Sequence, residues 1–436
     1  MLIEFTVGNY RSFKKPVTFS LLASSLTEYK DTHVFAAHKL NLLKSAIIYG
    51  ANASGKSSFF KAISFMKNFI FNSAKETQIT EKIDVQNFKL STETENKPAL
   101  FEIIFLVDQM RYRYGFQVTE EKVTAEWLFH VPTTKEARLF IREQNNIVVG
   151  PNFKEGKGLE ARTRDNALFL SVAAQFNGEI SLKILSWFNK LTIISGLDDR
   201  RYMGVTLSMI KDSEFKQWAL KFLGIADIEI LDIDVEFQET DAEYLENLLK
   251  DVQKILRGQK IPKNKIKRID GFSAKTVHQK YDSKNRKKSY ERFEIAENES
   301  EGTKKLLALS GPIWDTLKNG KILFIDEFEA RLHQKLTLSL VKLFNSSKSN
   351  LKDAQFVLAT HDTNLLRNDL FRRDQIWFIN KDQYGVSDLY SLAEYKESNK
   401  ITRKDTAYGK NYLAGRYGGI PVINDFEGLF EVEDGK

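Results

Sequence analysis

One segment, residues 46–70, restricts the fold of this chain more than any other stretch. Its sequence is AIIYGANASGKSSFFKAISFMKNFI, in which the pattern G-x-x-x-x-G-K-[ST] runs from Gly50 to Ser57. The apolar run before Gly50 is typical of a buried strand that meets a tight turn. Beyond Ser57, apolar residues recur at the spacing of one helix face, namely Phe59, Ile63, Met66 and Ile70. The segment therefore predicts a strand, a loop and a helix in direct succession.

The residue types of this glycine loop (residues 50–57) suit the binding of phosphate. Gly50 and Gly55 allow positive φ angles, so that backbone N–H groups can converge on an anion at the start of a helix. Lys56 adds a positive charge for the β- and γ-phosphates, and the hydroxyl of Ser57 is placed to ligate Mg²⁺. The alternative is a Gly/Ser-rich loop that holds a lysine by chance, and both flanking elements argue against it. We expect nucleotide contacts from these residues: Gly50, Asn52, Ser54, Gly55, Lys56, Ser57 and Ser58.

A second segment ends in two carboxylates. Residues 321–325 are mostly apolar and precede Asp326 and Glu327. We expect Asp326 to hold Mg²⁺, and Glu327 to orient and deprotonate the attacking water. An apolar strand that ends in Asp-Glu is a weak signal alone. It becomes strong beside a phosphate loop, because phosphoryl transfer needs both a cradle for the phosphates and an anchor for the metal.

Two further positions leave a structural and a functional interpretation open. Ser300 and Gly302 precede an amphipathic helix, where they form either an ordinary cap or an anion site. His361 follows the apolar run 355–359, and a histidine in such a place is more often structural. In a parallel sheet, however, this is the edge at which α/β proteins bind their ligands.

The N-terminal residues form a separate pattern. Residues 2–7 alternate like an edge strand, and residues 17–22 are a second apolar stretch. Between them, the neighbours Tyr10 and Arg11 can stack on adenine and contact phosphate. By residue type alone, a turn with a packed tyrosine is the favoured interpretation.

Patterning divides the chain into three expected parts. Residues 1–130 hold the glycine loop and a β lobe, residues 131–292 form an inserted and mainly helical subdomain, and residues 293–436 complete the head. Strands are expected at 101–107, 112–118 and 123–130. Helices are expected within 165–191, 215–222 and 244–256. The buried face of the first helical region is assigned to Leu168, Leu170, Phe176, Ile180, Ile184 and Phe188.

The segment 257–292 is strongly basic. It holds thirteen Lys/Arg residues against three acids. One interpretation is a solvated loop or hairpin, and the other is a contact surface for nucleic acid or an acidic partner. Aromatic residues are few within it, only Phe272, Tyr281 and Tyr290.

Composition excludes several classes of protein. The 436 residues include no cysteine, which rules out disulfides, thiol catalysis and cysteine zinc sites. No run approaches eighteen apolar residues, and the start of the chain alternates like a strand, so we expect neither a membrane span nor a cleaved signal peptide. A cytoplasmic location follows as an expectation. The net charge of +7 suggests a polyanionic partner only weakly.

Taken together, the motifs resemble a known group. The glycine loop (Walker A), a signature-like turn at 300–304, the Walker B segment 321–327, a D-loop-like segment 329–332 and a switch histidine, His361, occur in the order of ABC-type ATPase heads, as in SMC-like repair proteins and OLD-family ATPases. More narrowly, six stretches look like the RloA-type ATPases of bacterial abortive-infection operons: LLASS, YGANASGKSS, TRDNALFLSVAAQFN, ESEGTKKL, DEFEARLH and KNYLAGRYGGIP. The resemblance covers nearly the whole chain. The sequence differs from the family pattern at two places. The signature-like turn reads SEGTK where the family has LSGGQ, and Glu329 stands where the family more often has aspartate.

The resemblance implies a fold and a set of ligands. The fold is α/β, an ABC-ATPase-like P-loop head with an antiparallel β lobe and an inserted, mainly helical subdomain. The ligands are ATP and Mg²⁺. Tyr10, Arg11 and Ser12 become expected nucleotide contacts, which reverses the preference from residue type alone. His361 would sense the γ-phosphate.

The resemblance also implies an assembly. Ser300 and Gly302 of one subunit would close on the γ-phosphate held by residues 55–57 of another, in a homodimer or higher oligomer that Glu327 dissolves by hydrolysis. ATP binding would thereby shift the population towards a closed state.

A separate effector is expected as a partner. OLD enzymes carry a C-terminal nuclease, whereas only about 35 residues follow residue 400 here, so a nuclease would be another polypeptide, as RloB-type nucleases are. Residues 408–421 either dock that effector or form a packed turn. The resulting expectation is the ATPase subunit of an anti-phage system. The alternatives are a repair ATPase that clamps DNA, for which Lys284, Lys287 and Lys288 would contact DNA, a scaffold without turnover, and, with less support, a transporter subunit.

Overall fold

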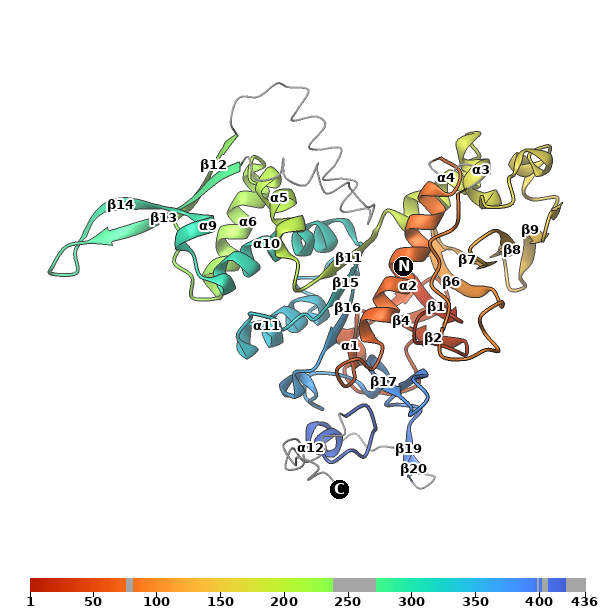
Figure 1. Cartoon of the computed structure of the whole chain (residues 1–436). Coiled ribbons are helices and arrows are strands. Elements are labelled where there is room, and N and C mark those ends of the chain that lie inside the picture. Colours follow the sequence, from red (N-terminus) through yellow and green to blue (C-terminus); the bar gives the residue numbers. More distant parts are fainter. Residues whose placement is uncertain (76–80, 238–271, 398–399, 402–406, 421–436) are drawn as a thin grey trace, which may run out of the picture.

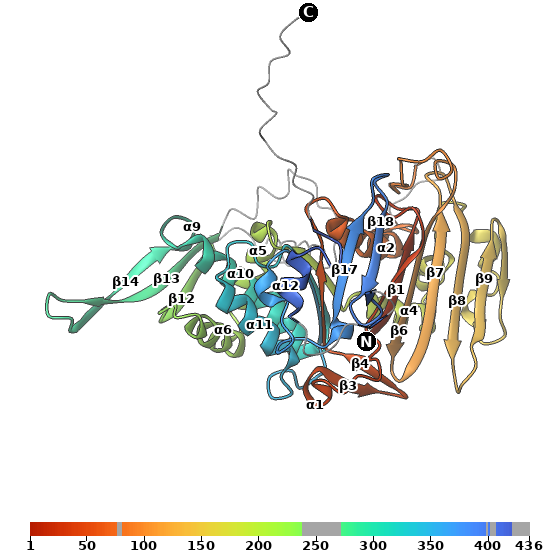
Figure 2. The same ribbon diagram turned by 90° about the horizontal axis from the view of Figure 1, so that it is seen from below.

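Two β-sheets lie on opposite sides of helix α2 (Lys56–Asn72), as Figures 1 and 2 show. The computed structural model describes residues 1–75, 81–237, 272–397, 400–401 and 407–420. One sheet is mainly parallel and leads into the glycine loop, and the other is antiparallel. Apolar side chains of both sheets and of α2 share one core. The predicted α/β class, a P-loop head with an antiparallel lobe, is confirmed.

The parallel sheet brings the ends of its strands to a common edge. Its order is β11-β15-β16-β5-β17-β18, and only the pair β17 and β18 is antiparallel. The strands are β11 (Leu191–Ser195), β15 (Ile322–Asp326), β16 (Gln355–Thr360), β5 (Ser45–Tyr49), β17 (Ile376–Lys381) and β18 (Ser387–Ser391). In β5, Ile48 packs towards α2, and Ile47 packs towards the helices behind the sheet. Because both faces of the sheet are covered, its central strands β15, β16 and β5 are mostly apolar.

The antiparallel sheet has the order β10-β9-β8-β7-β6-β1-β2. Its strands are β10 (Asn146–Val149), β9 (Ala137–Glu143), β8 (Val123–Val131), β7 (Met110–Val118), β6 (Ala99–Val107), β1 (Leu2–Gly8) and β2 (Val17–Ser20). The three strands expected between 101 and 130 are confirmed. The expectation of an edge strand at 2–7 was wrong, because β1 pairs with β2 on one side and with β6 on the other.

Helices cover the outer face of the parallel sheet and cap the antiparallel sheet. They are α3 (Phe169–Gln175), α4 (Glu179–Phe188), α5 (Asp199–Met209), α6 (Ser213–Ile225), α10 (Glu301–Asn319), α11 (Gln334–Asn345) and α12 (Tyr408–Leu413). The helical region expected within 165–191 is present but broken, because Asn177 takes a φ of 61° between α3 and α4. Phe176, assigned to the buried face, is 54% exposed at this break.

A three-stranded sheet extends away from α5 and α6 (Figures 1 and 2). It consists of β12 (Asp232–Phe237), β13 (Phe272–Tyr281) and β14 (Lys287–Glu294). We call residues 272–294 the arm. The helix expected at 244–256 and residues 257–271 of the basic segment lie outside the described residues.

The expected division into three parts stays a prediction, although individual elements differ from it. Strands β9 and β10 lie beyond residue 130, yet they extend the antiparallel sheet, and β11 lies within 131–292, yet it pairs with β15. Sequence patterning places strands but not their partners, because pairing over a long sequence separation leaves no local signal.

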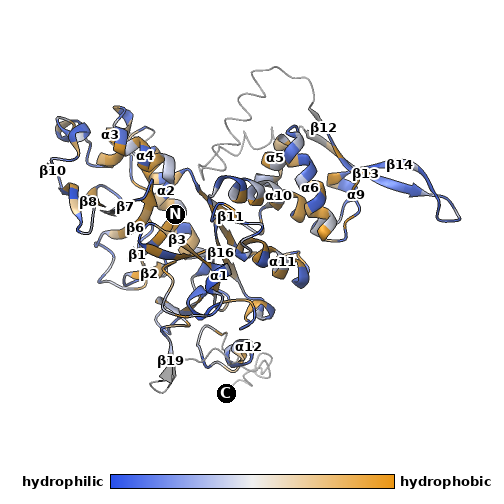
Figure 3. Ribbon diagram, turned by 180° about the vertical axis from the view of Figure 1, so that it is seen from behind, coloured by the Kyte–Doolittle hydropathy of each residue, from blue (hydrophilic) through white to orange (hydrophobic). Residues whose placement is uncertain are grey.

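The remaining elements are short. They are α1 (Lys30–His33), β3 (Val34–Ala37), β4 (Leu40–Leu43), α9 (Ile295–Asn298), β19 (Lys396–Glu397), β20 (Lys400–Ile401) and the 3₁₀ turns Lys154–Gly156, Glu160–Arg162, Thr363–Leu365 and Arg373–Gln375. Hydrophobic residues concentrate in the central strands, whereas the arm is hydrophilic (Figure 3). Within the described ranges, every helix is too short or too polar to cross a membrane.

The C-terminal turn is packed against the parallel sheet. Tyr408, Tyr412 and Tyr417 are at most 5% exposed, and the ring of Tyr412 lies 5.7 Å from that of Tyr49 at the end of β5. Of the two interpretations of residues 408–421, the packed turn is the one observed for residues 408–420. These tyrosines are therefore not an exposed docking surface.

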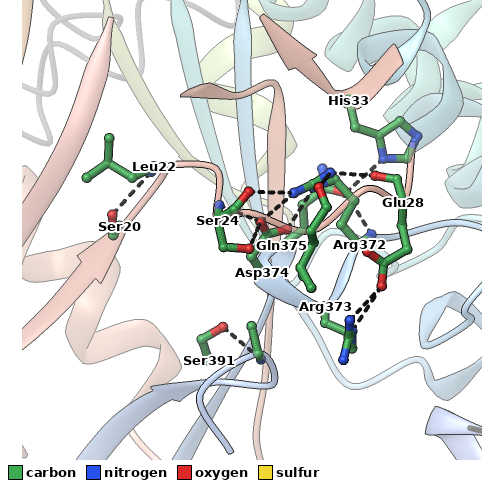
Figure 4. A network of polar contacts seen from close by, with 12 residues as sticks. Ser20, Leu22, Ser24, Glu28, His33, Arg372, Arg373, Asp374, Gln375 and Ser391 are labelled. Atoms are coloured by element: carbon green, nitrogen blue, oxygen red, sulfur yellow. Dashed lines mark hydrogen bonds and ion pairs between the residues drawn. The ribbon is translucent and has the colours of Figure 1, made fainter. Parts of the chain in front are cut away.

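A buried polar network holds the segment after β2 against the start of β17 (Figure 4). Arg372 is fully buried, and its guanidinium donates to Asp374 at 2.7 Å and to the carbonyl of Leu26 at 3.0 Å. Asp374 in turn accepts from the backbone N–H of Ser24 at 2.9 Å. Each buried charge thus has an opposite charge and hydrogen-bond partners, which offsets the cost of removing it from water.

His33 belongs to this network and gives it a pH dependence. Its Nδ1 lies 2.8 Å from Oε1 of Gln375, and burial lowers the pKa of His33 from 6.5 to about 4. The unfolded chain therefore binds a proton at a higher pH than the folded chain does. We predict that the free energy of unfolding falls as pH falls from 6.5 towards 4, with a contribution from His33 of about 2 kcal/mol by pH 5.

Urea unfolding of the wild type and of His33→Gln at several pH values checks this prediction. The variant should be less stable at neutral pH, and the difference should shrink as the pH falls. His38→Gln serves as the control, because His38 is exposed. A difference between His33→Gln and wild type that stays constant with pH would contradict the assignment.

Candidate nucleotide-binding site

The glycine loop connects β5 to α2 and leaves the first amides of the helix without a side-chain cap. Gly55 is the N-cap residue, with a φ of 122°. A Cβ at Gly55 would lie 2.5 Å from Oγ of Ser387 and 2.8 Å from Oγ of Ser12. A Cβ at Gly50 would lie 2.4 Å from Oγ of Ser54. The backbone path therefore requires both glycines, and the free amides at the start of α2 suit an anion.

Lys56 lies among carboxylates from the second segment. It is only 8% exposed, and its ammonium group donates to the carbonyl of Gly50 at 2.6 Å. Burial lowers the pKa of Lys56, and three nearby carboxylates act in the opposite direction: Asp326, Glu329 and Glu327. The fold thus brings together groups that are 270 positions apart in the chain.

Asp326 and Ser57 form a pair of oxygen donors that suits Mg²⁺. Burial raises the pKa of Asp326, and the nearby side chain of Ser57 acts in the opposite direction. The Oδ1 atom of Asp326 is buried without a hydrogen-bond partner in the described part of the chain. Mg²⁺ in nucleotide sites takes one or two protein oxygens and completes its shell with phosphates and water. These two residues therefore fit a nucleotide-bound magnesium ion.

Glu327 is held in a strained backbone conformation. It follows β15 with a φ of 53°, a value that costs energy for a residue other than glycine. Gly196, which follows β11, supports it from the neighbouring strand, since its N–H donates to the carbonyl of Asp326 at 2.7 Å. A Cβ at Gly196 would lie only 2.1 Å from the carbonyl oxygen of Glu327. The loop after β11 therefore fixes the turn that carries Glu327.

Glu329 and His361 form an ion-pair geometry beside this turn. Oε1 of Glu329 lies 2.7 Å from Nδ1 of His361 and accepts from its backbone N–H at 2.8 Å. The other oxygen, Oε2, is buried without a partner among the described residues, whereas the imidazole is 67% exposed. Glu329 thus orients a histidine that faces outwards from the edge of the sheet.

Ser300 caps helix α10 and remains exposed. Its Oγ accepts from the backbone N–H of Thr303 at 3.1 Å, which matches the structural interpretation of an ordinary cap. Gly302 lies in the first turn, where a Cβ would be 3.3 Å from the carbonyl oxygen of Arg331. The signature-like turn therefore lies against the segment that follows Glu327, with Ser300 at the surface.

Lys305, one turn further along α10, ties these parts together. Its ammonium group is fully buried and donates to the carbonyl of Gly196 at 2.8 Å and to that of Ala330 at 2.5 Å. One side chain thereby joins the signature-like turn, the loop after β11 and the D-loop-like segment. This role had no signal in the sequence, because a lysine on a helix is usually solvated.

Of the three expected contacts near the N-terminus, Tyr10 lies in the hydrophobic core and Ser12 lies at the site. Tyr10 is 3% exposed and packs on Phe65 and Phe101, so the packed-tyrosine interpretation is the one observed, and its ring is not available to an adenine. Arg11 has a φ of 51°, and its N–H donates to the carbonyl of Gln86 at 2.7 Å. Ser12 lies beside the glycine loop.

Ser387 is another residue of the site that sequence reasoning missed. Its N–H donates to the carbonyl of Ser12 at 2.7 Å, and its Oγ donates to the carbonyl of Ser54. It begins β18 and follows an ordinary hairpin turn, so no motif marks it. Of the remaining predicted residues, Asn52 is exposed and Ser58 is partly buried in the first turn of α2.

Four buried oxygen atoms around the site have no hydrogen-bond partner among the described residues. They are Ser12 Oγ, Ser54 Oγ, Asp326 Oδ1 and Glu329 Oε2. Buried polar atoms are nearly always paired, with protein groups, water or a ligand. Their gathering at one edge of the sheet is what a site for a polar, oxygen-rich ligand and its metal ion requires.

The contact between Gly196 and Glu327 yields a test. We predict that Gly196→Ala lowers ATP turnover by about a hundredfold, because the added Cβ displaces the backbone of Glu327. Nucleotide binding should persist, because the glycine loop is untouched. Phosphate release and equilibrium binding of a fluorescent ATP analogue measure the two effects separately.

Gly224→Ala is the matched control, since a Cβ there meets no atom within 4 Å. It should leave turnover unchanged. Wild-type turnover by Gly196→Ala would contradict the support assigned to Gly196.

The chain is similar to several solved SMC head domains. The SMC head domain from Thermotoga maritima has 12% identity and a TM-score of 0.40, covering 89% of this chain and 98% of that one. An SMC head bound to the C-terminal winged-helix domain of ScpA has 14% identity and a TM-score of 0.44, covering 91% and 98%. A third, from Pyrococcus furiosus and bound to the C-terminal domain of ScpA, has 15% identity and a TM-score of 0.36, covering 89% and 96%. No curated protein matches the chain.

A protein family matches much more directly. The family described as "AAA domain, putative AbiEii toxin, Type IV TA system" matches residues 45–367. This range begins at β5, includes the glycine loop and both carboxylates, and ends beyond His361. The match covers well over half of the sequence, and the chain belongs to this family of P-loop ATPase domains.

Proposed function

We propose that this protein binds and hydrolyses ATP with Mg²⁺ as the switch subunit of an anti-phage, abortive-infection system. The observation that carries the proposal is the arrangement of Lys56, Ser57 and Asp326, in which a buried cation and two oxygen donors lie beside the free amides of α2. The chain would act in the cytoplasm, where ATP is available. The RloA-type motifs and the toxin–antitoxin description of the family support the biological setting.

The residues of the site divide the chemistry of ATP hydrolysis between them. The amides of the glycine loop and Lys56 would hold the β- and γ-phosphates, and Ser57 and Asp326 would ligate Mg²⁺, which when bound supplies positive charge beside the phosphates. Glu327 orients a water and accepts its proton as the water oxygen bonds to the γ-phosphorus. The bond from that phosphorus to the β-phosphate oxygen breaks, giving ADP and phosphate. His361, held by Glu329, contacts the γ-phosphate and reports its loss.

A dimer around ATP supplies the switch. Ser300 is exposed and Gly302 partly so, and both lie at the start of α10, where the helix dipole favours a phosphate on a second subunit. Lys305 ties this turn to the segment carrying Glu327. Contact with the partner's nucleotide would thus be transmitted to the hydrolytic turn. A separate effector, such as a nuclease, would be held or released according to the state of this dimer or of a larger homo-oligomer.

The first test is the substitution Glu327→Gln. It keeps the shape of the side chain and removes the base, so we predict that turnover falls by about a hundredfold or more, while ATP binding persists. The ATP-bound dimer should become long-lived, which light scattering after gel filtration detects.

Glu121→Gln, in an exposed turn, is the control and should behave as wild type. Normal hydrolysis by Glu327→Gln would refute the assigned base. A wild-type protein that binds ATP without releasing phosphate would favour the scaffold alternative.

A mixing experiment tests the composite site. We predict that Lys56→Ala and Gly302→Glu are each inactive, and that an equal mixture regains about a quarter of wild-type activity, because half of the dimers are mixed and each has one intact site. Mixing Lys56→Ala with itself, expressed from two preparations, is the control. No recovery in a mixture whose subunits exchange would mean that each subunit hydrolyses ATP alone.

A further inference from the structure

The arm carries more positive charge than its own acids can balance. Four of its cations are paired: Lys275 with Glu294, Lys280 with Glu291, Arg286 with Asp282, and Arg292 with Asp234 of β12. Three lysines remain for which the described part of the chain shows no ion pair: Lys284, Lys287 and Lys288. All three are exposed at the outer end of the arm. Lys284 lies in the turn between β13 and β14, and Lys287 and Lys288 are the first two residues of β14. Their charge is therefore open to a partner.

Exposed aromatic rings accompany these lysines. Tyr290 is 65% exposed and Tyr281 is 47% exposed. Along β14, alternate residues share a face, which places Tyr290 between Lys288 and Arg292. A large ring in water next to cations is the arrangement by which proteins stack on a base while holding the backbone phosphates. An acidic protein would use the lysines but would have no particular need for the rings.

The base of the arm is bonded to the signature-like turn. The carboxylate of Glu299, the residue before Ser300, is largely buried, and its Oε1 lies 2.8 Å from Nε2 of His278. The same oxygen accepts from the hydroxyl of Thr276, which is also on β13. A movement of the arm would therefore act on the residue that precedes Ser300.

We propose that the arm binds the phosphate backbone of a nucleic acid through Lys284, Lys287 and Lys288, with Tyr290 stacking on a base, and that the bond between β13 and Glu299 transmits this binding to Ser300. The charge favours phosphates, and the exposed tyrosine favours nucleic acid over an acidic protein. The second half of the proposal, transmission, rests on the proposed ATP-dependent switch. The first half does not.

Binding is measured first, on the full chain without ATP, by fluorescence anisotropy with labelled duplex DNA and with single-stranded DNA of the same sequence. The triple variant Lys284→Ala, Lys287→Ala, Lys288→Ala should bind at least about tenfold more weakly and lose about three units from the slope of log K against log salt. The control removes three exposed lysines of the antiparallel lobe, Lys122, Lys135 and Lys157, and should keep both values. Unchanged DNA binding by the arm variant would overturn the proposal.

Tyrosine substitutions separate the two sources of negative charge. Tyr290→Ala should weaken binding of single-stranded DNA roughly tenfold, and Tyr290→Phe should keep it, because stacking needs the ring and not the hydroxyl. Polyglutamate is the competitor that represents an acidic protein. If polyglutamate binds as tightly as DNA and Tyr290→Ala changes neither, the arm is a site for an acidic protein and the nucleic-acid proposal fails.

Transmission is measured as phosphate release with and without saturating DNA. Wild type should be stimulated several-fold, and His278→Ala and Thr276→Val should bind DNA within about twofold of wild type yet lose the stimulation. Stimulation that survives in both variants would overturn the transmission route and leave the binding site standing. A protein that binds DNA but never releases phosphate would instead contradict the proposed ATPase, which keeps the two failures apart.

Discussion

The site depends on the electrostatic interaction between the buried carboxylate of Asp326 and the ammonium group of Lys56. Burial makes each charged form costly, as the lowered pKa of Lys56 and the raised pKa of Asp326 reflect. Each charge offsets part of the desolvation cost of the other, so removal of either group would leave the other as an uncompensated buried charge. The parallel sheet makes this interaction possible, because β5 and β15 both flank β16 and end at the same edge. The rest of the architecture keeps this edge in place, with α2 between the two sheets.

The sequence allowed the prediction of the elements that carry the motifs. The strand before the glycine loop, the helix after it, the strand before Asp326 and three strands of the antiparallel lobe are present as expected, because each has a strong local period or motif. Sequence patterning failed where the position of a residue depends on distant parts of the chain or on a break in a helix. Strand β1 alternates like an edge strand but has neighbours on both sides, and Phe176 has an apolar side chain but lies at a helix break.

Within the site, the motif residues were identifiable and their supports were not. Gly196, Lys305 and Ser387 carry no recognisable pattern, yet each contacts the backbone of a motif. Such supports act through carbonyl groups, which every residue possesses, so the sequence of the motif cannot reveal them. Glu329 is an intermediate case, because its place in the D-loop-like segment was visible but its contact with His361 depends on how the two strand ends are arranged.

The contribution of β18 has a consequence for biosynthesis. Ser387 closes the glycine loop from a position 333 residues further along the chain than Ser54. While the ribosome is still adding the middle of the chain, the glycine loop has already been synthesised but lacks its contact with Ser387. Such long-range closure is slow to form, and the nascent chain would complete this pocket only after residue 387 has been added and has left the ribosome. A glycine loop that is closed in this way would stay incomplete on every nascent chain that still lacks β18.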